Sequence, residues 1–347
     1  MEIKLNGVRY TDMALVEKVA VRELYAFLEE WFNNEPYVAG HTSGSTGIPK
    51  EIRLDKEDMR ASARLTNAFF RIDSGSVLLL CLPVSYIAGK MMVVRALEAG
   101  ADLLVEPPSS RPFAGLDRQV DLAAVVPLQM ETSLDSPEDA ERLHWVRQII
   151  IGGAPVSPVL EKRLTGTGAA CFATYGMTET VSHVALRRIG HVDYAAVGEV
   201  YFTVDERDCL VIHAPHLKTR VFVTNDMVSL LDATHFQWLG RYDHVINSGG
   251  VKFFPEKIEE KLSGKIPCRF FISSLPDQRL GERIVLVLEG ERWSASRMEW
   301  LRDCLHKTLL PYEVPKEIWL LPRFRETDSG KVIRDMKGAI PASGDGA

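Results

Sequence analysis

Over the first 200 residues, short apolar runs alternate with longer stretches in which apolar residues recur every three or four positions. This alternation is typical of α/β proteins, whose buried strands are connected by helices. We expect one helix over residues 21–32 and another that begins after an Asp55 N-cap and ends near Phe70. Short strands are expected over residues 37–39, 77–82, 103–105, 122–126, 148–151 and 169–174.

The pattern changes twice in the second half of the chain. From Val200 the helical periodicity disappears, and short strands at 210–213, 220–224, 228–231 and 236–239 predict a small antiparallel sheet or barrel. After Gly240, we expect a helix with Pro255 at its first position, two strands (269–273 and 284–288) and a helix over 296–309. The fold class is therefore α/β: a layered N-terminal domain with an antiparallel β subdomain (1–242) and a small α+β C-terminal domain (243–347), with a boundary near Asp243.

Composition narrows the class of protein. The 347 residues are 46% hydrophobic and 25% charged, as in a globular protein, and the formal net charge of −6 comes without a basic block that would favour a nucleic acid or an anionic membrane. The longest apolar run is far below the ~18 residues of a membrane span, and the first residues do not resemble a signal peptide, which predicts a cytoplasmic location. Five cysteines without a C-x-x-C pair argue against a disulfide framework or a zinc cluster. The Gly/Ser/Ala-rich C-terminal tail is expected to be disordered.

A glycine- and hydroxyl-rich loop carries the first chemical signal. Small residues in one run allow backbone N–H groups and hydroxyls to point inward together, as in loops that surround phosphate oxygens. The loop is not a Walker motif, because its lysine follows a proline and precedes a glutamate, and alone it could be a flexible turn. The residues expected to bind phosphates are Thr42, Ser43, Gly44, Ser45, Thr46, Gly47 and Lys50.

Five further segments follow this loop in a fixed order. They are IGGAP at 151–155, YGMTET at 175–180, Asp226 in TND, GRYD at 240–243 continuing to a GGVKFFPEKIE stretch at 249–259, and SGKVIR at 329–334. With these six motifs in order, the chain resembles the adenylate-forming superfamily of acyl-CoA synthetases, peptide-synthetase adenylation domains and beetle luciferases.

The resemblance implies ATP and Mg²⁺ as cofactors and CoA as a second substrate. It places adenine between the backbone of Gly153, Ala154 and Pro155 and the ring of Tyr175, which Gly176 follows. By the same resemblance, Thr178 hydrogen-bonds the α-phosphate and Glu179 binds the Mg²⁺ ion. Asp226 accepts hydrogen bonds from the ribose hydroxyls, and Arg241 donates a hydrogen bond nearby. A single carboxylate suits Mg²⁺, which takes its remaining ligands from phosphates and water.

Two more roles depend on the same resemblance. Lys331 bridges the incoming carboxylate and the α-phosphate, and Asp243 is the hinge about which a mobile C-terminal domain turns between two half-reactions. Simpler interpretations stay open. Glu179 could be a solvated helix residue, Asp226 and Asp243 could be turn residues, and Lys331 could be a surface lysine.

The chain also departs from the family pattern. Glu51 replaces a small residue, Asn225 a glycine, and His244 a common aspartate, although none of these removes a group assigned to the chemistry. The phosphate loop begins at Thr42, whereas most relatives carry well over a hundred residues before it. How the acyl and CoA sites are enclosed is therefore open, and a homodimer could supply the missing wall.

Two local matches point to the acid. Residues 175–186 resemble the same segment of the o-succinylbenzoate–CoA ligases of menaquinone biosynthesis. Residues 82–89 resemble a family segment that borders the acyl group, and Tyr86 stands where that segment usually has a histidine. A second substrate carboxylate needs a cation in an apolar pocket. Lys90 is the candidate, with a solvated lysine as the alternative, and His183 either faces the aromatic ring or packs in the core.

The resulting hypothesis is an AMP-forming acid–CoA ligase that acts on o-succinylbenzoate through an acyl-AMP intermediate. Its partners are small molecules: the acid, ATP and CoA. Two rivals stay open. One is the same chemistry with another aryl or short acyl acid, or with a carrier thiol or amine as acceptor. The other is a scaffold that binds nucleotide without turnover.

Overall fold

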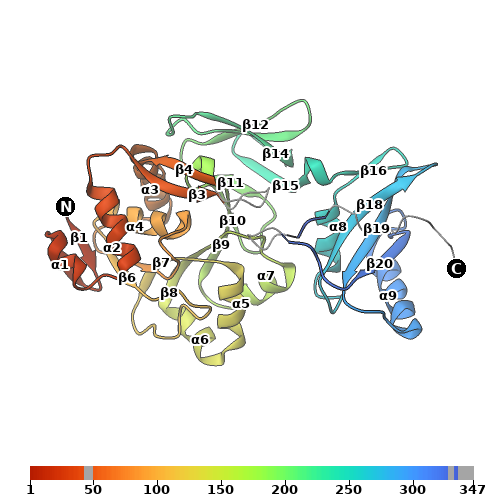
Figure 1. Cartoon of the computed structure of the whole chain (residues 1–347), viewed down its shortest axis with the longest axis horizontal. Helices are drawn as coiled ribbons and strands as arrows, with labels where there is room; N and C mark the ends of the chain where they lie inside the picture. The colour runs from red at the N-terminus through yellow and green to blue at the C-terminus, as the bar shows by residue number, and fades with distance from the viewer. Residues whose placement is uncertain (43–49, 327–331, 335–347) are drawn as a thin grey trace.

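The computed structural model describes residues 1–42, 50–326 and 332–334. Groups of one or two strands alternate with helices up to residue 176, as expected for an α/β protein (Figure 1). This part contains β1 (Ile3–Leu5), β2 (Val8–Tyr10), α1 (Met13–Glu17), α2 (Arg22–Phe32), β3 (Tyr37–Thr42), β4 (Lys50–Asp55), α3 (Lys56–Phe70), β5 (Val77–Leu80), α4 (Ile87–Ala99), β6 (Asp102–Val105), β7 (Val120–Val125), α5 (Pro127–Asp135), α6 (Pro137–Arg142), η1 (Leu143–Trp145), β8 (Val146–Ile151), α7 (Pro158–Leu164) and β9 (Ala170–Gly176).

A 13-stranded sheet forms the centre, in the order β12-β13-β14-β15-β11-β10-β9-β8-β7-β5-β6-β1-β2. Strands β5 to β9 are parallel, so their carboxyl ends share one edge. One core cluster packs α2, α3 and α4 on the sheet through Leu24, Met59 and Met91, and another packs α5 and α7 through Met130 and Leu160. The parallel strands are thus buried by helices on both faces, which explains their continuous apolar sequences.

Antiparallel strands were expected from Val200 as a small sheet or barrel. They begin earlier, at His183, and continue the large sheet. They are β10 (His183–Arg188), β11 (Tyr194–Ala196), β12 (Tyr201–Val204), β13 (Cys209–His213), β14 (Val221–Leu230) and β15 (His235–Arg241), with η2 (Thr178–Thr180) before them. Hydrogen bonds from β9 to β10, from β10 to β11 and from β11 to β15 connect them to the parallel strands. The two strands expected over 220–231 are one strand, β14, whose pairing with β15 shifts between Met227 and Val228.

A second sheet follows η3 (Tyr242–His244), with the strand order β17-β16-β19-β18 and β20 parallel to β19. Its core is a separate cluster that includes Ile246, Leu286 and Leu305 (right side of Figure 1). The expected boundary residue, Asp243, lies in η3 between the two sheets. The elements are β16 (Ile246–Ser248), β17 (Val251–Phe253), α8 (Pro255–Leu262), β18 (Phe270–Asp277), β19 (Gly281–Glu289), α9 (Ala295–Thr308) and β20 (Glu317–Leu321).

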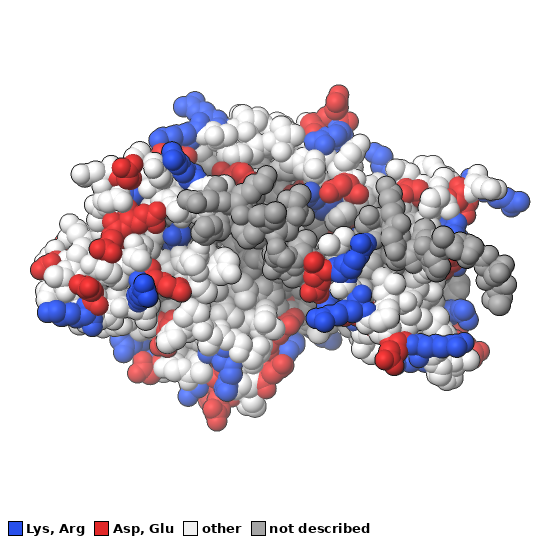
Figure 2. Space-filling view, in the orientation of Figure 1, with Lys and Arg blue, Asp and Glu red and all other residues white. Residues whose placement is uncertain are grey.

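Local chemistry explains where the predicted helices begin. Asp55 is the N-cap of α3 and accepts hydrogen bonds from the backbone N–H groups of Glu57 and Asp58 at 3.0 and 3.3 Å. Pro255 occupies the first turn of α8, where its missing N–H costs no hydrogen bond. Among the described residues, none of the helices has the length and apolar character that crossing a membrane requires. Acidic and basic side chains are interspersed over the face shown in Figure 2.

Candidate active site

The nucleotide motifs meet at the carboxyl edge of the parallel strands. β8 ends at Ile151 and leads into Gly152 to Pro155, while its parallel neighbour β9 ends with Tyr175 and Gly176. The carboxyl ends of parallel strands are where open α/β sheets bind ligands. Gly153 has φ +81°, which favours glycine, and a Cβ at Gly152 would lie 2.5 Å from the Thr174 hydroxyl.

Asp226, expected at the ribose, forms one hydrogen-bonded group with Tyr175, expected at the adenine, and with Trp238. The Tyr175 hydroxyl donates to Asp226 Oδ2 at 2.7 Å, and Trp238 Nε1 donates to Asp226 Oδ1 at 3.2 Å. Burial and the neighbouring Asp226 carboxylate raise the pKa of Tyr175 well above its usual value, so the phenol is neutral and remains a donor. Trp238 did not stand out in the sequence, because nothing in its strand context shows that its indole faces Asp226.

Arg241 connects this group to the expected hinge. Its guanidinium donates to the Asp243 carboxylate at 3.1 and 3.3 Å and lies 3.9 Å from Asp226 Oδ1. Burial acts to raise the pKa of Asp243, but the hydrogen bonds and charge of Arg241 outweigh it and lower that pKa. The pair is therefore ionised at neutral pH.

Thr178 and Glu179 lie in the 3₁₀ turn η2 directly after β9. Thr180 fixes this turn, since its hydroxyl accepts from the Met177 N–H at 3.0 Å. Glu179 is exposed, and its side chain makes no hydrogen bond or ion pair with the residues that the structure describes. No cluster of three or more His, Cys, Asp or Glu side chains that could hold a metal occurs in that part of the chain. A Mg²⁺ ion at Glu179 would therefore take its other ligands from phosphates and water.

A strained turn follows immediately. Val181 has φ +65° and ψ −40°, and the Ser182 N–H donates to the Thr180 carbonyl at 2.7 Å, which makes a γ-turn with positive φ at a β-branched residue. Strain of this kind is typical of functional sites, where the surrounding structure holds it in place.

A buried polar group lies behind this turn. Arg95 of α4 is 2% exposed and donates to the Ser182 hydroxyl at 2.7 Å, while His183 Nε2 lies 3.1 Å from the Thr66 hydroxyl. Arg95 Nε has no hydrogen-bond partner, and no described carboxylate pairs with this guanidinium. Burial lowers the pKa of Arg95 to about 10, so it is still a cation at neutral pH. Its only sequence signal is an arginine within the apolar run MMVVRAL.

The other residues expected at the acyl group lie at the start of α4. Tyr86 is the exposed N-cap, and Lys90 is buried, with its ammonium 3.9 Å from Glu30 and 4.6 Å from the centre of the Phe27 ring. Lys90 thus has an anion of its own, whereas Arg95 has none. The geometry favours Arg95 over Lys90 as a partner for a substrate carboxylate.

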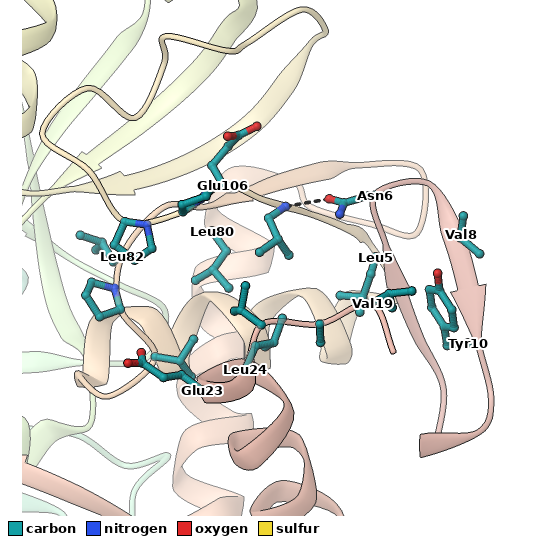
Figure 3. A pocket seen from close by; sticks show the side chains of 17 residues that line it. Leu5, Asn6, Val8, Tyr10, Val19, Glu23, Leu24, Leu80, Leu82 and Glu106 are labelled. Atoms are coloured by element: carbon teal, nitrogen blue, oxygen red, sulfur yellow. Dashed lines mark hydrogen bonds between the residues drawn. The ribbon is translucent and has the colours of Figure 1, made fainter. Parts of the chain in front are cut away.

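A cavity of about 350 Å³ opens at the carboxyl ends of β5 and β6 (Figure 3). Its lining is mainly aliphatic and includes Leu24, Leu80 and Leu82, together with the carboxylates Glu23 and Glu106. No lysine, arginine or histidine belongs to this described lining, so the cavity does not suit an anionic group.

The predicted phosphate loop lies partly outside the described residues, and the predicted catalytic lysine lies wholly outside them. Thr42 pairs with Lys50 at the ends of β3 and β4, which brings the flanks of residues 43–49 together. The predicted ligands Ser43, Gly44, Ser45, Thr46 and Gly47, as well as Lys331 and the C-terminal tail, are outside the described residues. Their roles stay predictions.

Comparison with known proteins gives the family. A family model for AMP-binding enzymes matches residues 15–212. The chain belongs to the AMP-binding enzyme family. The expected class, an AMP-forming acyl-CoA synthetase, is confirmed at the level of this family. A solved acyl-CoA synthetase (AMP-forming)/AMP-acid ligase II-like protein of Dyadobacter fermentans is 34% identical, with a TM-score of 0.62 over 93% of this chain and 96% of that one.

More distant family members agree on the fold. The o-succinylbenzoate coenzyme A synthetase of Bacillus subtilis, in complex with ATP and magnesium ion, has a TM-score of 0.68 at 19% identity, over 85% of this chain and 68% of that one. The expected α/β fold class is thus confirmed. Curated family members include the 2-succinylbenzoate–CoA ligase of Haemophilus influenzae, 25% identical over 88% of this chain and 71% of its own length, and the indoleacetate–CoA ligase of Aromatoleum aromaticum, 27% identical over 86% and 66%. The chain thus spans about two thirds of these relatives.

Proposed function

We propose that this chain is an ATP-dependent, AMP-forming ligase that joins o-succinylbenzoate to CoA in menaquinone biosynthesis. The observation that carries the choice of acid is Arg95, a buried cation without a described carboxylate partner, placed behind the turn that follows β9. o-Succinylbenzoate has two carboxylates, one to be activated and one to be paired. A buried arginine is suited to the second, because its planar donor fork matches a carboxylate.

The nucleotide half of the proposal uses the group around Tyr175. Asp226 accepts two hydrogen bonds in this structure and keeps lone pairs for the ribose hydroxyls. Adenine lies between the Tyr175 ring and the backbone of residues 153–155. Thr178 donates to the α-phosphate, and the loop from Thr42 to Lys50 surrounds the β- and γ-phosphates. Mg²⁺, held by Glu179, neutralises phosphate charge when bound.

The reaction then runs in two steps. The acid carboxylate attacks the α-phosphorus, pyrophosphate leaves, and Lys331 bridges the two anions as they meet. The C-terminal domain, residues 243–347, next turns about Asp243 relative to residues 1–242, and the CoA thiol displaces AMP from the anhydride. The separate cores of the two sheets support this division, because each can stay intact while the other moves. A homodimer and a cytoplasmic location stay predictions.

The function is tested by AMP release from MgATP with o-succinylbenzoate, indoleacetate or ferulate, each with and without CoA. The last two acids have one carboxylate and are named by relatives of similar identity. We expect CoA-dependent AMP release and a thioester mass with o-succinylbenzoate. Faster AMP release with an acid that has one carboxylate would contradict o-succinylbenzoate as the substrate. No AMP release with any of the acids would favour a scaffold that binds nucleotide without turnover.

Arg95→Met tests the carboxylate partner. Loss of a buried charged hydrogen bond of about 1.5–3 kcal/mol should raise the KM for o-succinylbenzoate about 10- to 100-fold and leave the KM for ATP unchanged. The fold should tolerate methionine, because an uncompensated buried charge is itself costly. Lys90→Met is the comparison on the same helix for the acid alone and should leave the KM for o-succinylbenzoate unchanged. A raised acid KM for Lys90→Met and not for Arg95→Met would assign this role to Lys90.

A further inference from the structure

The hairpin that carries the predicted phosphate loop is not part of either large sheet. β3 and β4 form a two-stranded sheet of their own, with Val38 and Leu54 buried in the core of α2, α3 and α4. The hairpin lies beside α2, which contacts β3, and α3, which contacts β4 (Figure 1). In the part of the chain that the structure describes, no strand ladder connects the hairpin to the carboxyl edge where Tyr175 and Asp226 meet, so other contacts must set its position.

One such contact comes from α2. Glu30 Oε1 accepts a hydrogen bond from the Ala39 N–H at 2.5 Å. Ala39 is opposite Arg53 in the hairpin register, and its N–H points to α2 instead of β4. A charged acceptor makes this hydrogen bond stronger than one between neutral groups. Glu30 thus attaches the β3 backbone, three residues before Thr42, to the helix.

The second oxygen of Glu30 faces α4. Oε2 lies 3.9 Å from the Lys90 ammonium, which also rests 4.6 Å from the Phe27 ring centre. Burial lowers the pKa of Lys90, and the Glu30 charge opposes that shift. Lys90 is 7% exposed, so removing its anion would leave a cation paired with little but an aromatic face. Glu30 and Lys90 therefore connect α2, α4 and the hairpin.

We propose that Glu30 is a positioning residue for the nucleotide phosphates, which acts through the Ala39 N–H on the β3–β4 hairpin, and that Lys90 is its counter-ion. Glu30 touches no substrate in this assignment. The proposal rests on the ATP-dependent function proposed above, because it requires that the segment between Thr42 and Lys50 binds phosphates. The structural part of the proposal, that Glu30 attaches the hairpin to α2, does not depend on catalytic activity.

Hydrogen exchange tests the structural half without any activity. Peptides that cover residues 33–42 are followed in the full chain and in Glu30→Ala, Glu30→Gln and Glu29→Gln. Glu29 is the matched control, since it is an exposed glutamate on the same helix. We expect at least tenfold faster exchange of the Ala39 amide in Glu30→Ala, a smaller change in Glu30→Gln, whose amide oxygen can still accept, and none in Glu29→Gln. Unchanged exchange in Glu30→Ala would overturn the proposal.

Kinetics test the nucleotide half. We expect Glu30→Ala to raise the KM for ATP about tenfold and to change the KM for the acid less than twofold. Lys90→Met should change the ATP KM in the same direction, and the double variant should be no worse than Glu30→Ala, because both residues act through one contact. Leu143→Ala, a buried site in the opposite core, controls for lost stability and should leave the ATP KM unchanged.

The two proposals fail in different ways. If the full chain binds ATP by calorimetry but turns over no acid, the ATP Kd replaces the KM and still decides the role of Glu30. A raised acid KM with an unchanged ATP KM in Lys90→Met would overturn the counter-ion assignment. Absence of ATP binding by the full chain would contradict the function and the nucleotide half together, while faster exchange in Glu30→Ala would support the hairpin attachment alone.

Discussion

Buried polar side chains near the turn after β9 make stability depend on pH. Burial, followed by the charge of Arg95, holds the pKa of His183 well below 6.5, so the ring is neutral in the folded protein. In the unfolded chain it binds a proton below about pH 6.5. The unfolded state therefore carries more protons, and the free energy of unfolding should fall by up to about 1.4 kcal/mol per pH unit below that value.

This dependence can be measured by urea unfolding between pH 7.5 and 5.0. His183→Gln, which removes the titrating group, should flatten the slope, and His191→Gln, at an exposed position, should not. Burial also lowers the pKa of His216, which leaves a residual slope of the same sign. An unchanged slope in His183→Gln would contradict the assignment.

A substitution at a single residue, Lys331, tests the proposed chemistry. Lys331→Ala should reduce acyl-AMP formation by at least 100-fold, because the ammonium that bridges two anions is lost. Thioester formation from supplied acyl-AMP and CoA should retain most of its rate, since this step does not need that cation. Each half-reaction is measured separately by rapid quench, and an equal loss in both would count against the role.

At the scale of elements, the γ-turn between η2 and β10 departs from normal backbone preferences. Strain at a β-branched residue with positive φ is about 1–3 kcal/mol, and glycine removes it. Val181 is also buried, so both Val181→Ala and Val181→Gly lose packing. We expect Val181→Gly to be no less stable than Val181→Ala, although glycine usually costs about 0.5–1 kcal/mol more in a strand.

Val125 provides the comparison, since it is buried in β7 and pairs with Ile151 of β8 in a ladder without a register shift. There, Val125→Gly should be less stable than Val125→Ala in chemical denaturation. The same order at both positions would mean that the turn at Val181 is not strained.

At the scale of the whole molecule, the two sheets have separate cores on either side of η3. We expect two transitions in calorimetry, because few buried apolar contacts join the cores. Leu286→Ala should lower the melting temperature of the transition that belongs to the second sheet, and Ile149→Ala that of the large sheet. Each substitution should reduce the free energy of unfolding of its part by about 2–5 kcal/mol. A single transition that shifts with both substitutions would show that the halves unfold together.

Several elements could be predicted because their signals are local. The Asp55 cap, the first-turn Pro255 and the apolar runs of β5 to β9 each act through neighbours in sequence. The strands β1 and β2 were not predicted, because such three-residue runs become strands only through distant pairing, here of β1 with β6 and of β2 with β1. β14 was divided in two for a related reason, since its irregular pairing is set by β15.

The amino-acid sequence by itself determined the family and the α/β class and predicted the nucleotide residues, because the order of motifs and the hydrophobic periodicity are properties of the sequence. Only the tertiary structure decided which charges are paired. Lys90 and Arg95 lie on the same helix five residues apart, yet one faces Glu30 and the other has no described carboxylate. The state of a buried charge depends on what packs around it, and here these neighbours come from α2, from the turn at Ser182 and from β10, which are distant in sequence.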